Sequence, residues 1–334
     1  MILAGDIGGT NVRLAAFELE SSRLQCVVEK IYKAADHKGL PEILTHFISS
    51  EGILVDRACF GAAGPVRGGR VTFSNLDWVV DARELAEQLR LPTVGLLNDL
   101  EAYAFGISAL DEKHFVTLQE GAQNPVGNTA VISAGTGLGE AGMHWDGFRH
   151  YPYPCEGGHT DFAPRNDLEF ELLRYLMSKH EHVSWERILS GPGIKNIYEF
   201  LRDRKVAEEP AWLADQMKQA RDIPALISKL ALEHKAPICE RTMEIFVSVY
   251  GAETGNCALK FLSVGGIYIG GSIAAKTLPL IQQPAFMQAF LAKGRLQKLL
   301  RDIPVKVVLN DDAGLLGAAQ FTLVQKAFGV SGRS

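Results

Sequence analysis

The chain has 334 residues, and at about 150 residues per domain this length predicts two domains. Hydrophobic residues make up 47% and charged residues 22%, a globular composition that excludes wholesale disorder. The 34 basic and 39 acidic side chains give a formal net charge of -5. This balance argues against a nucleic-acid-binding protein, because such proteins need a basic face to neutralise phosphates.

Targeting signals and cysteine spacing point to the cytoplasm. An acidic residue stands at Asp6 and no basic residue precedes Arg13, which is not the pattern of a secretory signal. No uncharged apolar run approaches the ~18 residues that span a bilayer. The five cysteines are far apart and include no CxxC pair, which predicts reduced, buried thiols and neither a disulfide framework nor a zinc site. We therefore expect a cytoplasmic protein with no membrane or nucleic-acid partner.

The first 110 residues predict strands that alternate with helices. Strands are expected over 2–7, 12–17, 23–32, 57–60 and 93–97, and helices over 40–51, 82–89 and 99–110. Asp81, with Glu84 three residues later, forms a capping box at the start of the second helix. This alternation indicates a parallel or mixed sheet with helices packed against it.

The opening pattern returns at residue 129. A strand over 129–133, a glycine turn over 135–139 and a strand over 140–145 repeat the N-terminal order at an offset of 127 residues. This weak repeat predicts two related halves that each begin with a hairpin. The polar, turn-rich segment 120–128 places a domain boundary near 110–128.

The second half also carries helices. Asn166 caps one helix, and a long apolar helix over 238–262 contains Gly251 and Gly255, which we interpret as close packing on a buried face. Strands over 264–269 and 305–309 follow, and then a final helix. We expect this last helix to return to the first domain, because a short helix needs a sheet to cover.

The segment Gly5-Asp6-Ile7-Gly8-Gly9-Thr10 is a candidate phosphate site. A glycine turn between two strands lets backbone N–H groups approach phosphate oxygens without interference from a Cβ. Asp6 is suited to hold Mg²⁺ through water, and Thr10 to donate its hydroxyl to a phosphate. The alternative is an ordinary hairpin in which the glycines supply only positive φ. The chain contains no GxxxxGK[ST] motif.

A second glycine turn, Gly135-Thr136-Gly137, has the same character. The overlapping residues 137–142 formally match GxGxxG, but a dinucleotide fingerprint requires that turn to open a helix. Residues 143–147 instead predict a strand followed by an Asp-Gly turn, so we reject a Rossmann domain. Two glycine hairpins favour a clamp on both sides of a polyphosphate.

Three further segments carry polar groups suited to a small polar ligand. Asn98-Asp99 lies at the carboxyl end of a buried strand, where ligands collect in open α/β sheets. The helix that starts there favours an ionised Asp99, although a plain N-cap is the alternative interpretation. The loop from Glu156 to His159 offers an acceptor and an imidazole to a polyhydroxy ligand, and no nearby His or Cys completes a zinc set. Glu186 is either a surface charge or a ligand directed by the Ser-Gly-Pro-Gly turn behind it.

Taken together, these motifs resemble bacterial glucokinases of the sugar kinase, Hsp70 and actin superfamily. In chain order the segments are GDIGGTNVRLA, SNLDW, NDLEAYAFG, AGTGLGEAG, CEGGHTDFAP, ERILSGPG, GGIYIGGS and NDDAGLLGAA. They extend from about residue 2 to about residue 325, and their order makes chance agreement implausible. The chain lacks the Cys-rich zinc motif common in the related repressor/ORF/kinase group, which places it with the zinc-free glucokinases.

The resemblance implies a two-domain α/β fold of the actin-like ATPase (ribonuclease H-like) type, with a cleft between a small domain (1–110 plus 311–334) and a large domain (111–310). It implies phosphorylation of D-glucose at the 6-hydroxyl by ATP with Mg²⁺, Asp99 as catalytic base, and a homodimer. The implied nucleotide-binding residues are Gly5, Asp6, Ile7, Gly8, Gly9, Thr10, Gly135, Thr136, Gly137, Gly270 and Gly271. The implied glucose-binding residues are Asn75, Asn98, Asp99, Glu156, His159 and Glu186.

Two other functions remain open at this point. A kinase for another hexose or an N-acetylhexosamine would share every nucleotide feature and differ around the 2-position of the sugar. A non-enzymatic ATPase module of the Hsp70 or actin kind would explain the glycine hairpins, but not the polar residues at 98–99 and 156–159. A sugar-responsive transcription factor is disfavoured, because the first strand begins at residue 2 and leaves no room for a helix-turn-helix arm.

Overall fold

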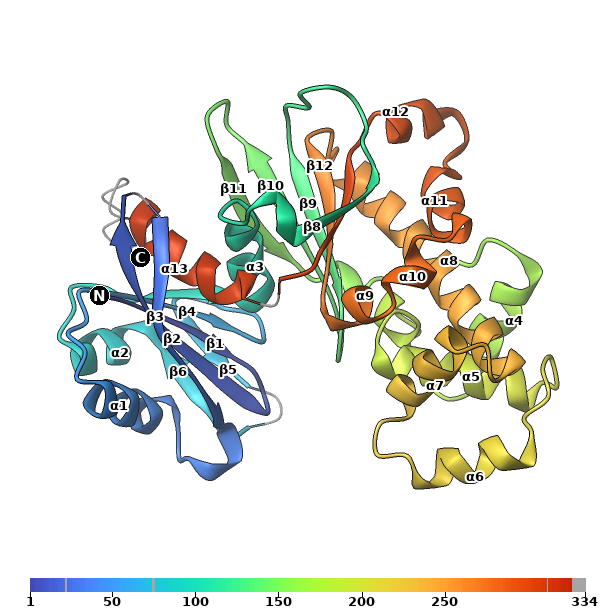
Figure 1. The fold of residues 1–334 in the computed structure, drawn as a ribbon, viewed down its shortest axis with the longest axis horizontal. Coiled ribbons are helices and arrows are strands. Elements are labelled where there is room, and N and C mark those ends of the chain that lie inside the picture. Colours follow the sequence, from blue (N-terminus) through green and yellow to red (C-terminus); the bar gives the residue numbers. More distant parts are fainter. Residues whose placement is uncertain (22, 74–75, 311, 326–334) are drawn as a thin grey trace. The chain divides into compact units, whose positions relative to one another are not determined.

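The computed structural model describes residues 1–21, 23–73, 76–310 and 312–325 (Figure 1). The chain divides into two compact units, each built around its own sheet. Unit 1 comprises Met1–His114, Tyr151–Pro154 and the segment from Asn310 onward. Unit 2 comprises Phe115–His150 and Cys155–Leu309.

The sheet of unit 1 has the strand order β3-β2-β1-β4-β7. Its strands are β1 (Ile2–Ile7), β2 (Asn11–Glu20), β3 (Arg23–Lys33), β4 (Arg57–Ala62) and β7 (Gly95–Asn98), and β5 (Arg70–Thr72) with β6 (Val79–Asp81) forms a separate hairpin. β1 is antiparallel to β2 and parallel to β4, which in turn is parallel to β7. The mixed sheet predicted from the alternation of strands and helices is confirmed.

Helices cover both faces of this sheet (Figure 1). They are α1 (Leu40–Glu51), α2 (Ala82–Leu89), α3 (Asp99–Ile107) and α13 (Ala313–Gln325). One core joins Leu3 and Leu14 of the sheet to Phe47 of α1 and Leu85 of α2. A second core joins other sheet residues to Phe105 of α3 and to α13. The final helix therefore packs in the first unit, as the sequence predicts.

The sheet of unit 2 has the order β11-β10-β9-β12-β13-β8, and of its edge strand β11 only the two end residues are grouped with unit 2 itself. Its strands are β8 (Phe115–Gln119), β9 (Thr129–Ala134), β10 (Leu138–Trp145), β11 (His150–Cys155), β12 (Gly266–Gly270) and β13 (Val305–Val308). β9 is antiparallel to β10 and parallel to β12, and β12 is parallel to β13. The five strands from β11 to β13 thus reproduce the strand order of unit 1, which confirms the predicted repeat. β8 adds an antiparallel strand at the β13 edge.

One long helix, α8, organises the helices of unit 2. The helices are α4 (Asp167–Met177), α5 (Gly191–Asp203), α6 (Ala211–Gln219), α7 (Ile223–Leu232), α8 (Pro237–Lys260), α9 (Ser272–Lys276), α10 (Leu278–Ile281), α11 (Pro284–Leu291) and α12 (Gln297–Arg301). α5, α7 and α11 pack against α8. A Cβ added at Gly251 would lie 2.1 Å from the carbonyl oxygen of Phe286, and one at Gly255 would lie 2.6 Å from that of Phe290. The two glycines therefore allow close packing, as predicted.

The five cysteines are all free thiols, but they are not all buried. Cys59, Cys239 and Cys257 are buried, and burial raises the pKa of each of these thiols. Cys155 is half-buried, and Cys26 is exposed on the edge strand β3. The prediction of buried thiols is therefore wrong for Cys26, because a strand at a sheet edge need not be covered. Within the described ranges, no helix is long and apolar enough to cross a membrane.

The contact between α3 and α13 in unit 1 can be tested by one methyl group. A Cβ added at Gly317 would lie 1.7 Å from the backbone oxygen of Ala102. Gly317→Ala is expected to destabilise the protein by about 1–3 kcal/mol in urea unfolding, because the helices must separate. Gly39→Ala is the control, since its Cβ would meet Pro41 at an ordinary 3.4 Å. Equal unfolding midpoints for the two variants would contradict the packing.

Candidate functional site

The first glycine turn joins β1 to β2 in unit 1. The backbone N–H of Gly8 donates to the carbonyl oxygen of Asn11 at 2.9 Å and closes the turn. Gly5 lies earlier, within β1, where a Cβ would come within 2.5 Å of the Phe60 ring. Gly5 thus permits packing of the sheet, whereas Gly8, Gly9 and the exposed Thr10 form the turn itself.

Asp6 lies near the end of β1, opposite Arg13 of β2. Its side chain is half-buried, and burial raises the pKa of the carboxyl, an effect that the Arg13 guanidinium partly offsets. Arg13 is also paired with Glu29 and Asp312. A Cβ added at Gly314 of α13 would stand 4.0 Å from the Asp6 carboxylate. A cation beside Asp6 would therefore stabilise an ionised carboxylate that burial disfavours.

Asn98, not Asp99, is the N-cap of α3. Its Oδ1 accepts the backbone N–H of Leu100 at 3.0 Å, and its Nδ2 donates to the carbonyl oxygen of Gly64 at 3.1 Å. Asp99 is the first residue of the helix, with an exposed side chain whose Oδ1 accepts the Leu100 N–H at 2.8 Å. The interpretation of Asp99 as a plain N-cap is therefore wrong, and its carboxylate is accessible at the positive end of a helix.

Sequence reasoning missed Glu101 on the same helix. Asn98 and Glu101 have the spacing of a capping box, which was a readable signal. The backbone N–H of Asn98 forms a hydrogen bond with the Glu101 carboxylate, which lowers the pKa of that group. Burial has the larger effect and raises this pKa to about 7. Glu101 thus helps to fix the residue that precedes Asp99.

The second glycine turn, between β9 and β10 in unit 2, contacts Glu186. The backbone N–H of Leu138 donates to Glu186 Oε2 at 3.0 Å. A Cβ added at Gly137 would lie 2.5 Å from the same oxygen, whereas one at Gly135 would have no described atom within 4 Å. Gly137 therefore makes room for Glu186, and Gly135 leaves open space beside the turn.

Glu186 is held by the start of α5. It lies in a 3₁₀ turn, Trp185–Arg187, and its carbonyl oxygen accepts the hydroxyl of Ser190 at 2.7 Å. Ser190 also caps α5, since its Oγ accepts the N–H of Gly193. The sequence predicts a separate Ser-Gly-Pro-Gly turn behind Glu186. In the structure this segment is instead the N-cap and first turn of α5. A Ser N-cap followed by Pro near the first helical position explains this difference.

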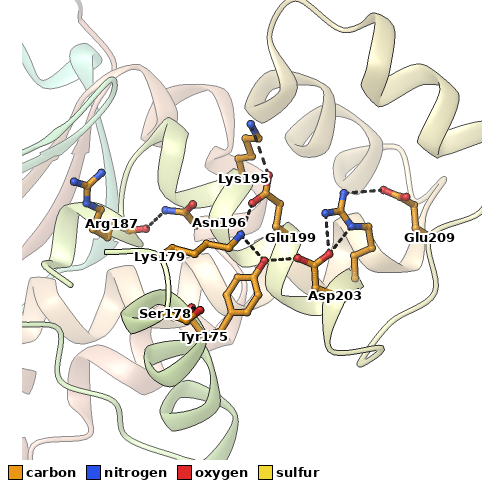
Figure 2. Close-up of polar contacts among 10 residues, drawn as sticks. Tyr175, Ser178, Lys179, Arg187, Lys195, Asn196, Glu199, Asp203 and Glu209 are labelled. Carbon is orange, nitrogen blue, oxygen red and sulfur yellow. Dashed lines mark hydrogen bonds and ion pairs between the residues drawn. The ribbon is translucent and has the colours of Figure 1, made fainter. Parts of the chain in front are cut away.

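A polar network connects α5 to the C-terminal end of α4 (Figure 2). Asn196 Nδ2 donates to the carbonyl oxygen of Arg187 at 2.8 Å, next to Glu186. Lys179 Nζ donates to Glu199 at 2.9 Å and to the Tyr175 hydroxyl at 2.6 Å, and that hydroxyl donates to Asp203. These bonds fix the helix on which Glu186 depends.

The loop 156–159 lies directly on β10. Residues Gly157–His159 form a 3₁₀ turn, and Glu156 and His159 are exposed. A Cβ added at Gly158 would lie 2.1 Å from the carbonyl oxygen of Leu138, and one at Gly157 would lie 1.9 Å from Glu140 Oε2. Gly158 is required because the backbone of β10 leaves no space for a Cβ, and Gly157 leaves room for the Glu140 carboxyl group. β10 thus brings loop 156–159 and Glu186 together.

A pocket of about 520 Å³ opens beside the second glycine turn, within unit 2. Gly135 and Thr136 form one part of its wall, and Ser272, Ile273 and Lys276 of α9 form another. The turn at Gly270-Gly271 leads into α9, and Gly271 has φ +85° with no room for a Cβ beside Ala134. Sequence reasoning missed the third part of the wall, on α7.

The predicted site residues fall into two sets. Gly5–Thr10, Asn98 and Asp99 lie in unit 1, and Gly135–Gly137, Glu156, His159, Glu186, Gly270 and Gly271 lie in unit 2. Within unit 2 they meet at the second glycine turn, with loop 156–159 and Glu186 on β10 and the pocket at Gly135. Asn75 lies outside the described residues.

Known proteins decide the family of this chain. The family model described as Glucokinase matches residues 3–325. The glucokinase of Nostoc sp. is 42% identical over 96% of this chain and 98% of its own length. A crystal structure of glucokinase from an Antarctic psychrotroph aligns with a TM-score of 0.83 at 30% identity, over 97% of this chain and 98% of that one. The chain belongs to the glucokinase family.

Membership makes the chain an enzyme that phosphorylates glucose, and it confirms the resemblance drawn from the eight segments. The fold is the two-domain actin-like ATPase fold. It is shared with a ROK family glucokinase from Streptomyces griseus, solved in complex with glucose and AMPPNP, at a TM-score of 0.66 and 20% identity over 97% of this chain and 99% of that one. A kinase specific for another hexose is not favoured by these relatives.

The different surroundings of Gly137 and Gly135 give a matched pair of variants. Gly137→Ala places a methyl group against Glu186, so we expect the KM for glucose to rise by about tenfold, equivalent to roughly 1.4 kcal/mol. Gly135→Ala faces the pocket and should leave this KM within about twofold. Steady-state kinetics with glucose varied at saturating ATP makes the comparison. The reverse order of effects would separate Glu186 from glucose binding.

Proposed function

We propose that the chain transfers the γ-phosphoryl group of ATP to the 6-hydroxyl of D-glucose. One observation carries the proposal: the turn between β9 and β10 contacts Glu186 through Gly137 and Leu138, and borders the pocket through Gly135. A nucleotide whose phosphates reach this turn from the pocket would meet a sugar held by Glu186. The AMPPNP complex of the Streptomyces griseus relative supports ATP as the donor.

In this proposal Asp99 is the catalytic base. Its carboxylate accepts the proton of the 6-hydroxyl while that oxygen attacks the γ-phosphorus in line. The bond from phosphorus to the bridging oxygen breaks, and ADP leaves. The exposed position at the N-terminus of α3 supports this role, because the positive end of a helix dipole favours a negatively charged group beside it. Phosphoryl transfer depends mainly on such positioning and on charge stabilisation.

Asp6 is the residue proposed to hold Mg²⁺, through a bound water. Its half-buried carboxylate, with a pKa raised by burial, fits a neighbouring divalent cation. Mg²⁺ would neutralise charge on the phosphate oxygens. The N–H groups of the turn at Gly8 and Gly9, together with the Thr10 hydroxyl, would bind phosphate beside it.

Glucose selectivity would come from Asn98, Glu156, His159 and Glu186, together with Asn75. Glu186 already accepts one bond from Leu138, and a carboxylate has further lone pairs for a sugar hydroxyl. A sugar that lacks the matching hydroxyl would leave such a group unpaired, at a cost of about 1–3 kcal/mol each. The adenosine would lie along Gly270-Gly271.

Location and assembly complete the proposal. We propose a cytoplasmic enzyme, because all five cysteines are free thiols. We also propose a homodimer, which light scattering coupled to size-exclusion chromatography would test directly.

Removal of the proposed base is the central test. Asp99→Asn keeps the size of the side chain but cannot accept the proton, so kcat should fall by about 10²–10⁴. Glucose affinity, measured by calorimetry, should be largely kept. The assay is ADP release with a panel of hexoses at fixed ATP, and wild type should favour glucose. Asp215→Asn, at an exposed acid on α6, is the control. Near-wild-type turnover in Asp99→Asn would remove this residue from the base role.

The pocket assignment is tested by filling the pocket. Ala225 is an exposed residue of the α7 wall, so a tryptophan there should occupy the pocket without disturbing the core. Ala225→Trp is expected to raise the KM for ATP by about tenfold or more, with glucose affinity unchanged. Ala211→Trp, at an exposed alanine that starts α6, is the matched control. An unchanged KM for ATP in Ala225→Trp would place the nucleotide elsewhere.

A further inference from the structure

Two buried glutamates face each other in unit 2. Glu140 of β10 is 1% exposed and Glu253 of α8 is fully buried. Among the described residues, no strong hydrogen-bond donor reaches either oxygen of Glu140, and the thiol of Cys257 beside it is only a weak donor. Ligand atoms of Glu140, Glu253 and Cys257 all lie within 4.8 Å of one another. Two ionised carboxylates cannot donate to each other, so this arrangement needs either a proton or a cation between them.

Existing bonds favour the proton. Both oxygens of Glu253 are already used: Oε1 accepts from Lys260 Nζ at 2.6 Å, and Oε2 accepts from Asn256 Nδ2 at 2.7 Å. Burial, and then the two carboxylates, raise the pKa of Cys257 far above its ordinary value, so this residue stays a thiol. An ammonium group and a protonated thiol make a poor metal site. A single proton on Glu140 instead supplies the missing donor, an O–H directed at Glu253.

The pair lies immediately beneath loop 156–159. A Cβ added at Gly157 would be 1.9 Å from Glu140 Oε2, so the carboxyl group touches the backbone of the loop. Cys155, which precedes the loop, donates its thiol to the backbone oxygen of Glu140 at 3.3 Å. A displacement of the Glu140 carboxyl group toward Gly157 would therefore press on the backbone between Glu156 and His159.

We propose that Glu140 and Glu253 share one proton, and that the protonated pair positions loop 156–159 for glucose, which makes Glu140 a positioning residue for the reaction. The inference rests on the proposed role of Glu156 and His159 in binding glucose. Loss of the proton places a second negative charge beneath Gly157. Repulsion from Glu253 then pushes the Glu140 carboxylate against the loop and weakens glucose binding.

The charges around the pair set the pH range. Burial and the charge of Glu253 raise the pKa of Glu140 to about 7, against the lowering effect of Lys260. Within the described part of the chain, the other titratable groups that face the pair are Cys257 on α8 and Cys155 before the loop. Lys293 bonds Asn256 and the carbonyl oxygen of Ala252, and burial lowers its pKa to about 8. Lys260 is thus the ammonium group bonded directly to a carboxylate of the pair.

The kinetic experiment compares wild type with Glu140→Gln from pH 6 to pH 9. The glutamine amide donates to Glu253 at every pH, as the protonated carboxyl does only at low pH. The KM for glucose should rise about 5- to 10-fold with pH in wild type and stay at its low-pH value in Glu140→Gln, while kcat changes in parallel in both. Glu169→Gln, at a buried glutamate paired with Arg165, is the control and should keep the wild-type pH dependence. A wild-type pH dependence in Glu140→Gln would overturn the proposal.

Thermal unfolding gives a second readout that does not use activity. The native pKa of Glu140 lies above its ordinary value of 4.5, so between about pH 4.5 and 7 the native state binds more protons than the unfolded state. The melting temperature of wild type minus that of Glu140→Gln should therefore fall as pH rises through this range, and level off above it. Parallel melting curves across the range would overturn the shared proton.

Two further measurements separate the possible failures. Glu156→Gln should raise the KM for glucose at all pH values, and an unchanged KM would overturn the sugar site on which the inference rests. An effect of Glu156→Gln without any effect of Glu140→Gln would overturn the shared proton alone. Metal analysis of the purified protein should find no zinc that depends on Glu140. If wild type held one equivalent of zinc and Glu140→Gln held none, the two glutamates would share a metal ion and not a proton.

Discussion

The site depends on close contacts that Glu186 and loop 156–159 make with the first residues of β10. The N–H of Leu138 binds Glu186, its carbonyl oxygen lies under Gly158, and the Glu140 side chain lies under Gly157. The loop therefore rests on the backbone of β10 at Gly158 and on the Glu140 carboxyl group at Gly157. Because the turn that begins β10 also borders the pocket, the proposed phosphate-binding and sugar-binding groups that belong to unit 2 are joined through this one strand.

The same hairpin opens both sheets, but each copy has acquired different chemistry. In unit 1 the first strand carries Asp6, whereas the corresponding position in unit 2 is Ser133. Unit 2 also places the segment containing α4–α7 between β11 and α8, and this segment supplies Glu186 and one wall of the pocket. The two sheets therefore share a strand order, while the segment containing α4–α7 supplies groups proposed to bind the substrates. A glycine turn in such a fold is therefore common to both units and does not by itself form a complete binding site.

Prediction from the sequence succeeded where the signal was local. Alternation, glycine turns and capping residues were enough to find most of the strands, the repeat and the cap at Asn166, but not β5, β6, β8 or β11. It failed where two distant segments decide the outcome. Glu140 and Glu253 are 113 residues apart, and each alone reads as an ordinary charged residue of a strand or a helix. The α7 wall of the pocket and the open edge that exposes Cys26 likewise depend on tertiary packing. The resemblance to glucokinases predicted more than the residue pattern alone. It assigned a reaction to the glycine turns, whereas the pattern alone is equally consistent with ordinary hairpins.

Burial of two carboxyl groups beneath a loop carries a large desolvation cost. Two apolar side chains of similar volume would avoid the desolvation cost, and replacements of this kind often stabilise proteins. Stability alone therefore does not explain Glu140 and Glu253. Hydrogen bonds from Lys260 and Asn256 fix the plane of the Glu253 carboxylate, and a donor on Glu140 would fix the second plane against the first. An aliphatic pair has no hydrogen bonds to fix the orientation of its side chains under Gly157, which the Glu140 carboxyl group approaches closely.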